Sequence, residues 1–227
     1  MADRVYRRKN GSYEARYVRG RDSATGKLKY GTVYGATREE AIARRAEKLG
    51  ISLDDPAGAS EMNILILGAG SFGREVREVL KSLRIFNKID FLDDNLTGED
   101  IKGKCEDAEF FRVTYACAFV AIGNNEIRKK YAEMLISAKY YIPTVISPDA
   151  IVSPNAKIGM GTMVFPQGHV GEAEVNRFCI VNANSLVDAE SKVGDYCHVD
   201  TGAIVLKGKN VPGGTWIKPG VIFGAVE

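Results

Sequence analysis

An aliphatic residue recurs every six positions through the last third of the sequence, and this spacing restricts the possible folds more than any other feature. The series starts at Ile146, shortens by one position between Val170 and Val175, and then keeps its phase to Ile217. A period of six fits neither a helical turn nor the two-residue alternation of a single strand. It fits a triangular prism in which each side is one hexapeptide and successive coils stack about 4.8 Å apart. The alternative, a β-sandwich of alternating strands, does not require a constant spacing.

Small side chains follow most of these aliphatic residues at a distance of four positions, where they would fill the corners of the prism. Two of them, Cys179 and Cys197, are three hexapeptides apart, so we expect their thiols to be stacked neighbours inside the prism. The other cysteines are Cys105 and Cys117. The absence of a C-x-x-C pair or a cysteine–histidine cluster argues against a metal site. Unpaired thiols suit a reducing compartment.

Composition and charge indicate a soluble protein with more than one part. The 227 residues include 45% hydrophobic and 26% charged side chains. No apolar run approaches the roughly 20 residues of a membrane span, and the N-terminus lacks a hydrophobic signal core, so we expect a cytoplasmic protein without membrane contact. Residues 1–50 hold 13 Lys and Arg against 6 Asp and Glu. This asymmetry predicts two parts with different partners.

Residues 1–50 are typical of a basic module of three strands and one helix. The strands are expected at residues 4–8, 13–18 and 28–34, with Asn10-Gly11 as a hairpin turn. Thr37 and Glu40 form a capping box for a helix at residues 38–49, and a linker follows at residues 51–61. The pattern of Arg and Lys between tyrosines resembles the arm-site DNA-binding domain of tyrosine recombinases, which implies DNA binding through this module. The alternative is a basic appendage with a solvated charged face.

A glycine-rich turn at residues 68–73 joins a predicted buried strand at residues 63–67 to a helix that extends to residue 83. Gly68 is expected to make the tight turn, Gly70 to let a phosphate approach the backbone, and Gly73 to pack the helix on the strand. The helix N-terminus would then face the anion. The G-x-G-x-x-G spacing is a weak signal alone, but here both the strand and the helix flank it.

Two further strands are predicted to end beside this turn. The strand at residues 88–92 ends at Asp93 and Asp94, where an acidic side chain can bind a ribose hydroxyl or a base edge. The strand at residues 116–121 leads to Asn124 and a helix at residues 126–138. This pattern is half of a dinucleotide-binding fold. A mononucleotide or a nucleotide-sugar is therefore favoured over a dinucleotide.

Four motifs in this order resemble the hexapeptide-repeat sugar acetyltransferases, the family of the sialic acid O-acetyltransferase and the bacillosamine-pathway N-acetyltransferase. They are residues 68–76, 91–94 and 120–124 and the prism, within residues 62–211. The resemblance implies a Rossmann-like nucleotide-sugar-binding domain at residues 62–143 and a left-handed parallel β-helix acyltransferase domain at residues 144–227. It also implies a homotrimer that binds acetyl-CoA between subunits and acetylates an amine or hydroxyl of the sugar. The residues assigned to the nucleotide-sugar are Gly68, Gly70, Gly73, Asp93, Asp94 and Asn124.

The base histidine of this family is absent. In the family a histidine takes the proton of the acceptor, and the matching segment, residues 180–195, has Ala189 at that place. The acidic neighbours Asp188 and Glu190 remain, and so does a second family histidine, His198. His198 follows Ala189 by half a coil, so only a neighbouring subunit would bring the two regions together.

Three outcomes are compatible with this loss. His198 or a carboxylate, Asp188 or Glu190, serves as the base; an amine acceptor reacts slowly without one; or the domain binds its ligand without catalysis. His169 is expected at a corner or on the surface, with a replacement base as the alternative.

CoA is assigned to the C-terminal coils. Lys207, Lys209 and Gly202 are the expected CoA-binding residues, and solvated lysines are the alternative for the two cations. A second class of function is a non-catalytic trimeric scaffold that binds ligand or DNA and displays three basic modules, since multivalent display strengthens weak binding.

Overall fold

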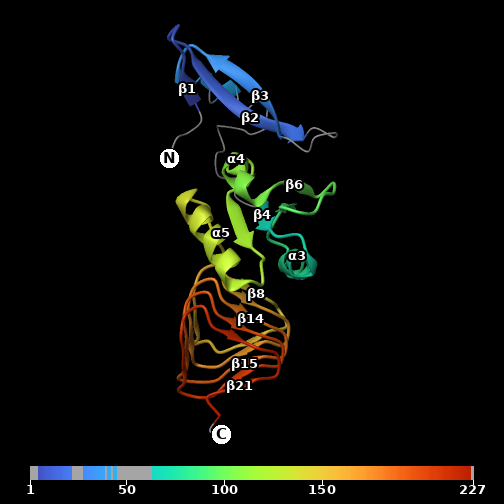
Figure 1. Cartoon of the computed structure of the whole chain (residues 1–227), viewed down its shortest axis with the longest axis vertical. Coiled ribbons are helices and arrows are strands. Elements are labelled where there is room, and N and C mark those ends of the chain that lie inside the picture. Colours follow the sequence, from blue (N-terminus) through green and yellow to red (C-terminus); the bar gives the residue numbers. More distant parts are fainter. Residues whose placement is uncertain (1–4, 22–27, 39, 42, 45–62, 226–227) are drawn as a thin grey trace.

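The computed structural model describes residues 5–21, 28–38, 40–41, 43–44 and 63–225. Within these ranges a small N-terminal sheet, an α/β domain and a prism of stacked strands follow one another along the long axis of the molecule (Figure 1). Most of the helix predicted at residues 38–49, and all of the linker predicted at residues 51–61, lies outside the described residues.

The N-terminal sheet is antiparallel, with its strands in chain order. Ala15 and Val33 are buried on one face. Tyr6 and Tyr34 lie on the other face and are 47% and 45% exposed, and the Arg8 guanidinium lies 5.0 Å from the centre of the Tyr34 ring. The predicted strands are confirmed, with β2 extending three residues further than expected. The strands are β1 (Val5–Arg7), β2 (Tyr13–Arg21) and β3 (Leu28–Gly35).

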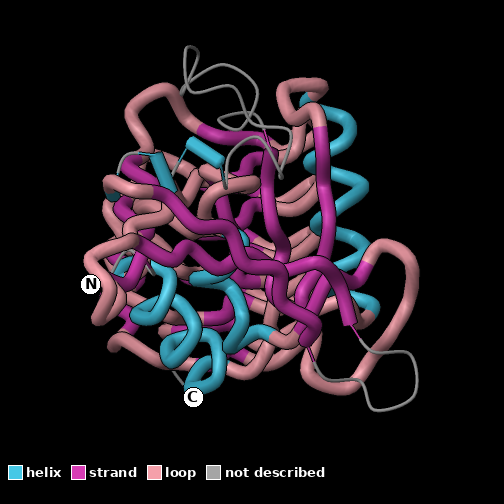
Figure 2. Tube along the Cα trace, turned by 90° about the horizontal axis from the view of Figure 1, so that it is seen from above, coloured by secondary structure: helices cyan, strands magenta, loops and turns pink. Residues whose placement is uncertain are grey.

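The α/β domain contains a four-stranded parallel sheet in the order β6-β5-β4-β7, covered by a helix on each face. Ile64 and Ile66 of β4 pack on the side of α3, whereas Leu65 and Leu67 pack on the side of α5. Figure 2 shows helices on both sides of the strands. The elements are β4 (Asn63–Leu67), α3 (Ser71–Leu83), β5 (Lys88–Leu92), β6 (Ile101–Gly103), η1 (Cys105–Asp107), α4 (Ala108–Phe111), β7 (Cys117–Val120) and α5 (Asn125–Ser137).

The edge strand β6 is a feature that the sequence analysis did not predict. It is only three residues long, and it is held by hydrogen bonds from Phe91 N to Asp100 O at 2.8 Å and from Asp93 N to Gly103 O at 2.9 Å. A strand this short has no apolar alternation to identify it. The short helices η1 and α4 were not predicted either, whereas β4, α3, β5, β7 and α5 lie within one residue of their predicted bounds.

The C-terminal part is a three-sided parallel β-helix, which confirms the predicted prism. The first face is β8 (Val145–Ile146), β11 (Met163–Val164), β14 (Ile180–Val181), β17 (His198–Val199) and β20 (Trp216–Ile217). The second face is β9 (Ile151–Val152), β12 (His169–Val170), β15 (Leu186–Val187), β18 (Ile204–Val205) and β21 (Ile222–Phe223). The third face is β10 (Lys157–Ile158), β13 (Glu174–Val175), β16 (Lys192–Val193) and β19 (Asn210–Val211).

The interior of the prism holds the repeated aliphatic residues as stacked columns. Val164, Val181, Val199 and Ile217 form one such column, and all four are buried. The small residues predicted at the corners are also inside, including the free thiols of Cys179 and Cys197. The slip in the repeat is a shortened corner after β12, where the Ala173 N–H donates to Gly171 O at 2.8 Å.

At ten corners of the prism, the residue three positions after the aliphatic residue lies in the left-handed backbone region. Glycine adopts this conformation without strain, but half of these corners use other residues. For this reason no glycine period was visible in the sequence. The corner residues with positive φ are Gly161, Gln167, Phe178, Asn184, Glu190, Tyr196, Gly202, Gly208, Gly214 and Gly220.

The α/β domain packs on the outer side of the first face of the prism. Val145, Met163 and Ile180 belong to one core with Ile64 of the α/β domain, so this domain covers the upper coils of the face. The next outward residue in the same column is His198, at the border of the covered region. No helix among the described residues is long and apolar enough to cross a bilayer.

Candidate functional site

The glycine-rich turn has the geometry expected of a phosphate-binding loop. Gly68 has φ of +102°, and a Cβ there would meet Ala121 O at 2.6 Å, while a Cβ on Gly73 would meet Gly68 O at 1.9 Å. Nothing lies within 4 Å of the place of a Cβ on Gly70. Gly68 and Gly73 are therefore required by packing, whereas the open side of Gly70 is free for a ligand.

The N-terminus of α3 adjoins this open side. Gly70 is the N-cap residue and supplies no side-chain hydrogen bond, and the first turn contains no acidic residue. The first backbone N–H groups of a helix lack intrahelical partners and carry a partial positive charge. A phosphate at Gly70 would meet these groups.

The carboxylate of Asp93 fixes the turn from the neighbouring strand. Its Oδ2 accepts from Ala69 N at 2.7 Å, and its Oδ1 accepts from Asn95 N and Leu96 N at 2.8 Å. Burial opposes ionisation, but these three hydrogen bonds outweigh it and lower the pKa of Asp93. An ionised carboxylate has further lone pairs, so contact with a ribose hydroxyl stays a prediction.

Asp94 is held in a similar way by two residues of its own domain. It accepts from Cys105 N at 2.9 Å and from the hydroxyl of Tyr131 at 2.5 Å. This carboxylate therefore links β5 to α5 and stiffens the sheet edge. Its predicted contact with the nucleotide-sugar is likewise untested.

A cavity of about 510 Å³ lies where the loop after β7 meets the prism. Asn124 lies in its wall and also caps α5, because its side chain accepts from Ile127 N at 3.0 Å. The Asn125 amide crosses from the loop to the prism and donates to Gly214 O at 2.8 Å. The lining residues are Gly123, Asn124, Asn125, Glu126, His198, Gly214 and Trp216.

The prism contributes one titratable side chain to the wall of this cavity, the imidazole of His198. Its side chain is 11% exposed, and its Nε2 is buried without a hydrogen-bond partner among the described residues. Nε2 lies 3.5 Å from Asp200 Oδ1, and the rings of His198 and Trp216 lie 6.5 Å apart in a stacked orientation. A buried polar atom without a partner is uncommon and is often functional.

Asp200 is fixed by three donors, which the sequence analysis did not foresee. They are Asn182 Nδ2 at 2.9 Å, Thr201 N at 2.7 Å and Trp216 Nε1 at 2.9 Å. Burial opposes ionisation of Asp200, but the bonds from Thr201 and Trp216 and the nearby His198 lower its pKa. Asp200 is therefore a fixed negative charge beside the imidazole.

Burial dominates the electrostatics of His198. It lowers the pKa of the imidazole below the ordinary 6.5, and Asp200 acts in the opposite direction. The positive charge of Arg128 lowers it further. His198 is consequently neutral at neutral pH, the form in which an imidazole accepts a proton.

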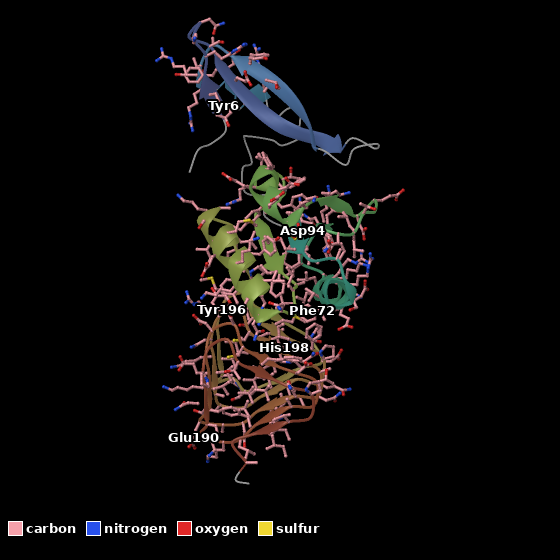
Figure 3. The ribbon with its side chains drawn as sticks, viewed as in Figure 1. Tyr6, Phe72, Asp94, Glu190, Tyr196 and His198 are labelled. Atoms are coloured by element: carbon pink, nitrogen blue, oxygen red, sulfur yellow. The ribbon has the colours of Figure 1, made fainter. Side chains whose placement is uncertain are left out.

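The other predicted catalytic residues lie elsewhere in the subunit. Asp188 and Glu190 flank Ala189 at the corner between the second and third faces, and Figure 3 shows Glu190 well separated from His198. The ε-ammonium of Lys207, one coil further on, pairs with Glu190 Oε1 at 2.9 Å. Within one subunit, the corner that holds Ala189 is therefore separate from the cavity that holds His198.

The predicted CoA residues are divided between two corners. Lys209 is exposed near the Ala189 corner, together with Lys207, whereas Gly202 lies at the corner between the first and second faces. His169 is exposed on β12, in agreement with its predicted surface position. No cluster of residues suited to hold a metal occurs within the described part of the chain.

Comparison with known proteins finds a family model that is similar to the α/β domain. Residues 63–135, from β4 to near the end of α5, match the family model described as the PglD N-terminal domain. This segment is similar to PglD N-terminal domains. The match includes the glycine-rich turn, Asp93, Asp94 and Asn124, so the predicted nucleotide-sugar residues all lie inside it.

Two curated relatives extend the similarity into the prism. A GDP-perosamine N-acetyltransferase of Escherichia coli O157:H7 is 27% identical over 152 residues, which are 61% of this chain and 67% of that protein. A UDP-N-acetylbacillosamine N-acetyltransferase of Bacillus subtilis (strain 168) is 33% identical over 111 residues, which are 45% of this chain and 50% of that protein. The chain thus spans half to two thirds of the length of these relatives.

Solved structures confirm the architecture. The acetyltransferase domain of PglB from Neisseria gonorrhoeae FA1090 has a TM-score of 0.65 at 26% identity, with coverage of 72% of this chain and 91% of that chain. The same domain in complex with acetyl coenzyme A has a TM-score of 0.61 at 23% identity, with coverage of 72% and 94%. The predicted resemblance to sugar acetyltransferases is confirmed. The DNA-binding resemblance of residues 1–50 stays a prediction.

Proposed function

We propose that the chain transfers the acetyl group of acetyl-CoA to an amino group of a nucleotide-linked sugar. The observation that carries this proposal is the cavity of about 510 Å³ that joins the loop after β7 to His198. The volume is within the usual range for small-molecule sites. The relatives are named as N-acetyltransferases of nucleotide-linked sugars, which favours an amine over a hydroxyl as the acceptor.

The nucleotide part of the acceptor is proposed to bind along the carboxyl ends of β4, β5 and β7. Its diphosphate lies against the open side of Gly70 and the first turn of α3. The Gly123–Asn124 peptide is proposed to contact the next part of the ligand. Its surface is open, because no atom lies within 4 Å of the place of a Cβ on Gly123. The sugar then extends into the cavity beside His198.

The acetyl transfer needs an acceptor for one proton. The nitrogen of the sugar amine attacks the thioester carbon, the carbon–sulfur bond breaks, and CoA leaves as its thiolate while the nitrogen loses a proton. We assign the proton to the imidazole of His198, which burial keeps neutral and Asp200 stabilises once charged. Ala189 has no group that accepts a proton, so residue 189 cannot be the base.

Acetyl-CoA is proposed to lie along the prism, with its phosphates near Lys207 and Lys209. The bond between Lys207 and Glu190 is exposed, with 62% and 68% of the two side chains accessible. Exposed ion pairs contribute little stability, so a phosphate can replace Glu190 at small cost.

A homotrimer is the assembly that we propose for this reaction. The outward column of the second face is apolar apart from His169, and its ends, Ile151 and Ile222, are 60% and 49% exposed. The outward column of the third face is polar, with Lys157, Glu174 and Lys192. Association through the second face would bury apolar surface and bring the Ala189 corner of one subunit towards His198 of the next.

Release of CoA thiol and the mass of the sugar product test this function. Wild-type protein is incubated with acetyl-CoA and a panel of UDP- and GDP-linked amino sugars, and we expect acetylation of at least one. His198→Asn should lower kcat by about 10²-fold or more. Lys130→Met, at an exposed residue of α5 that does not line the cavity, is the control and should leave kcat unchanged.

Two results would contradict the proposal. Equal kcat for His198→Asn and wild-type protein would remove His198 from catalysis. Binding of acetyl-CoA and nucleotide-sugars by calorimetry, without acetylation of any acceptor, would favour the non-catalytic scaffold.

A further inference from the structure

Arg128 is a buried charge that the proposed chemistry does not use. It lies in the first turn of α5, is 1% exposed, and is among the largest fully buried side chains of the described residues. Burial of an unpaired cation is costly, so a hydrophobic residue would satisfy packing at lower cost. The position therefore calls for an explanation beyond the core.

The guanidinium makes six hydrogen bonds, and every acceptor is neutral. Five are backbone carbonyl oxygens and one is the side-chain oxygen of Asn125. The contacts are Nε to Phe178 O at 2.8 Å, Nη1 to Ile122 O and Gly123 O at 2.9 Å, and Nη2 to Asn125 Oδ1 at 2.7 Å, Tyr196 O at 2.9 Å and Cys197 O at 3.2 Å.

These acceptors belong to three segments that are far apart in the sequence. Ile122 and Gly123 lie in the loop after β7, and Asn125 begins α5; Gly123 and Asn125 line the cavity. Phe178 stands before β14 on one coil of the prism. Cys197, on the next coil, directly precedes His198. One planar group with five N–H donors thus joins the loop to the coil that holds the imidazole.

The guanidinium also fixes the orientation of the Asn125 side-chain amide. Asn125 Oδ1 accepts from Arg128, which fixes the amide so that its Nδ2 donates to Gly214 O at 2.8 Å. Gly214 and Asn125 both line the cavity. The orientation of two walls of the cavity therefore depends on the guanidinium.

We propose that Arg128 is a positioning residue that sets the distance between the nucleotide-sugar loop and His198. The inference rests on the proposed function, since it assigns the loop to the acceptor and the imidazole to the proton. Small displacements of reacting groups have large effects on rate, and a shift of about 1 Å can cost roughly 10²-fold. A lysine at this position has one charged nitrogen and cannot make the six contacts.

Arg128→Lys, which keeps the charge, tests this role against Lys130→Met, a control at an exposed residue of the same helix. We expect Arg128→Lys to lower kcat by at least about 10-fold, with an unchanged KM for acetyl-CoA and an unchanged far-ultraviolet circular dichroism spectrum. Lys130→Met should match the wild type. The proposal is overturned if the folded Arg128→Lys variant has kcat within twofold of the control.

Nuclear magnetic resonance of the imidazole protons gives a readout that does not need turnover. The chain has two histidines, so His169 serves as an internal reference. The ligand is the nucleotide-linked amino sugar of the panel that binds most tightly, added to saturation. It should shift the His198 signal in the wild type and shift it much less in Arg128→Lys. The His169 signal should not move in either protein.

The two proposals can fail separately. If the wild type acetylates no acceptor, the proposed function is wrong, and the resonance experiment still decides the role of Arg128. A His198 shift of the same size in both proteins, or none in the wild type, overturns the positioning role.

Discussion

At the scale of single residues, the account depends on the pair His198 and Asp200. The sequence analysis identified His198 from the family resemblance but gave no reason to select Asp200, because the three donors that fix Asp200 come from different coils and a corner. Its assignment of Ala189 to the place of the family's base histidine stays a prediction. A residue such as Trp216 was not predicted because its role depends on stacking between coils that are 18 residues apart.

The pH dependence of kcat follows from the state of His198. Because burial lowers its pKa below 6.5, activity should fall on acidification with a midpoint below that value. Asp200→Asn removes the charge that raises this pKa, so its midpoint should lie lower still, with a reduced maximum rate. Steady-state rates between pH 5 and 8 check both curves. A wild-type midpoint clearly above 6.5 would contradict the assignment of His198 as a buried base.

The same pKa shift affects stability with a defined sign. The unfolded chain binds a proton at His198 more readily than the folded chain does, so stability should decrease as the pH falls through 6.5. His198→Asn should show a smaller loss of stability over this range. Urea unfolding at pH 7.5 and 5.5 makes the comparison, and equal losses in both proteins would show that His198 does not titrate abnormally.

At the scale of elements, local patterns were enough to predict most of the fold. The six-residue spacing predicted the β-helix, and the apolar run at β4 with the turn after it predicted the first strand and helix of the α/β domain. The short strand β6 and the positive-φ corners were not predicted. The former lacks a pattern, and the latter are set by the backbone geometry of the prism, since residues as large as Phe178 and Tyr196 occupy them.

Two glycines of the turn should separate stability from binding. Gly73→Ala places a Cβ 1.9 Å from Gly68 O, so α3 must move away from β4, with a loss of about 1–3 kcal/mol or more in the free energy of unfolding. Gly70→Ala meets no atom within 4 Å and should unfold like the wild type, yet bind nucleotide-sugars at least about 10-fold more weakly because the methyl group occupies the phosphate position. Denaturation and calorimetry measure the two effects. Full affinity in Gly70→Ala would move the phosphate elsewhere.

At the scale of the whole molecule, the three parts of the chain are visible together in Figure 1. The basic module stands at the end of the molecule opposite the C-terminus, with Tyr6 and Tyr34 exposed and Arg8 beside Tyr34. The sequence predicted the module, but the comparisons address residues from 63 onwards through the family model and do not test its partner.

Binding of duplex DNA by this module remains a prediction with a clear salt signature. The full chain should bind a labelled duplex at low ionic strength, and the logarithm of the association constant should fall linearly with the logarithm of the salt concentration. Replacement of Arg7, Arg8 and Lys9 by alanine should weaken binding and reduce the slope. Fluorescence anisotropy over a salt series measures both, and no binding by the full chain at low salt would eliminate the prediction.

The most direct test of the central claim is a crystal structure of the full chain with CoA and the preferred nucleotide-linked amino sugar. The account predicts the diphosphate at Gly70 and the first turn of α3, and the sugar amine in the cavity within hydrogen-bond distance of His198. An amine that points instead to the Ala189 corner, with His198 out of reach, would contradict it.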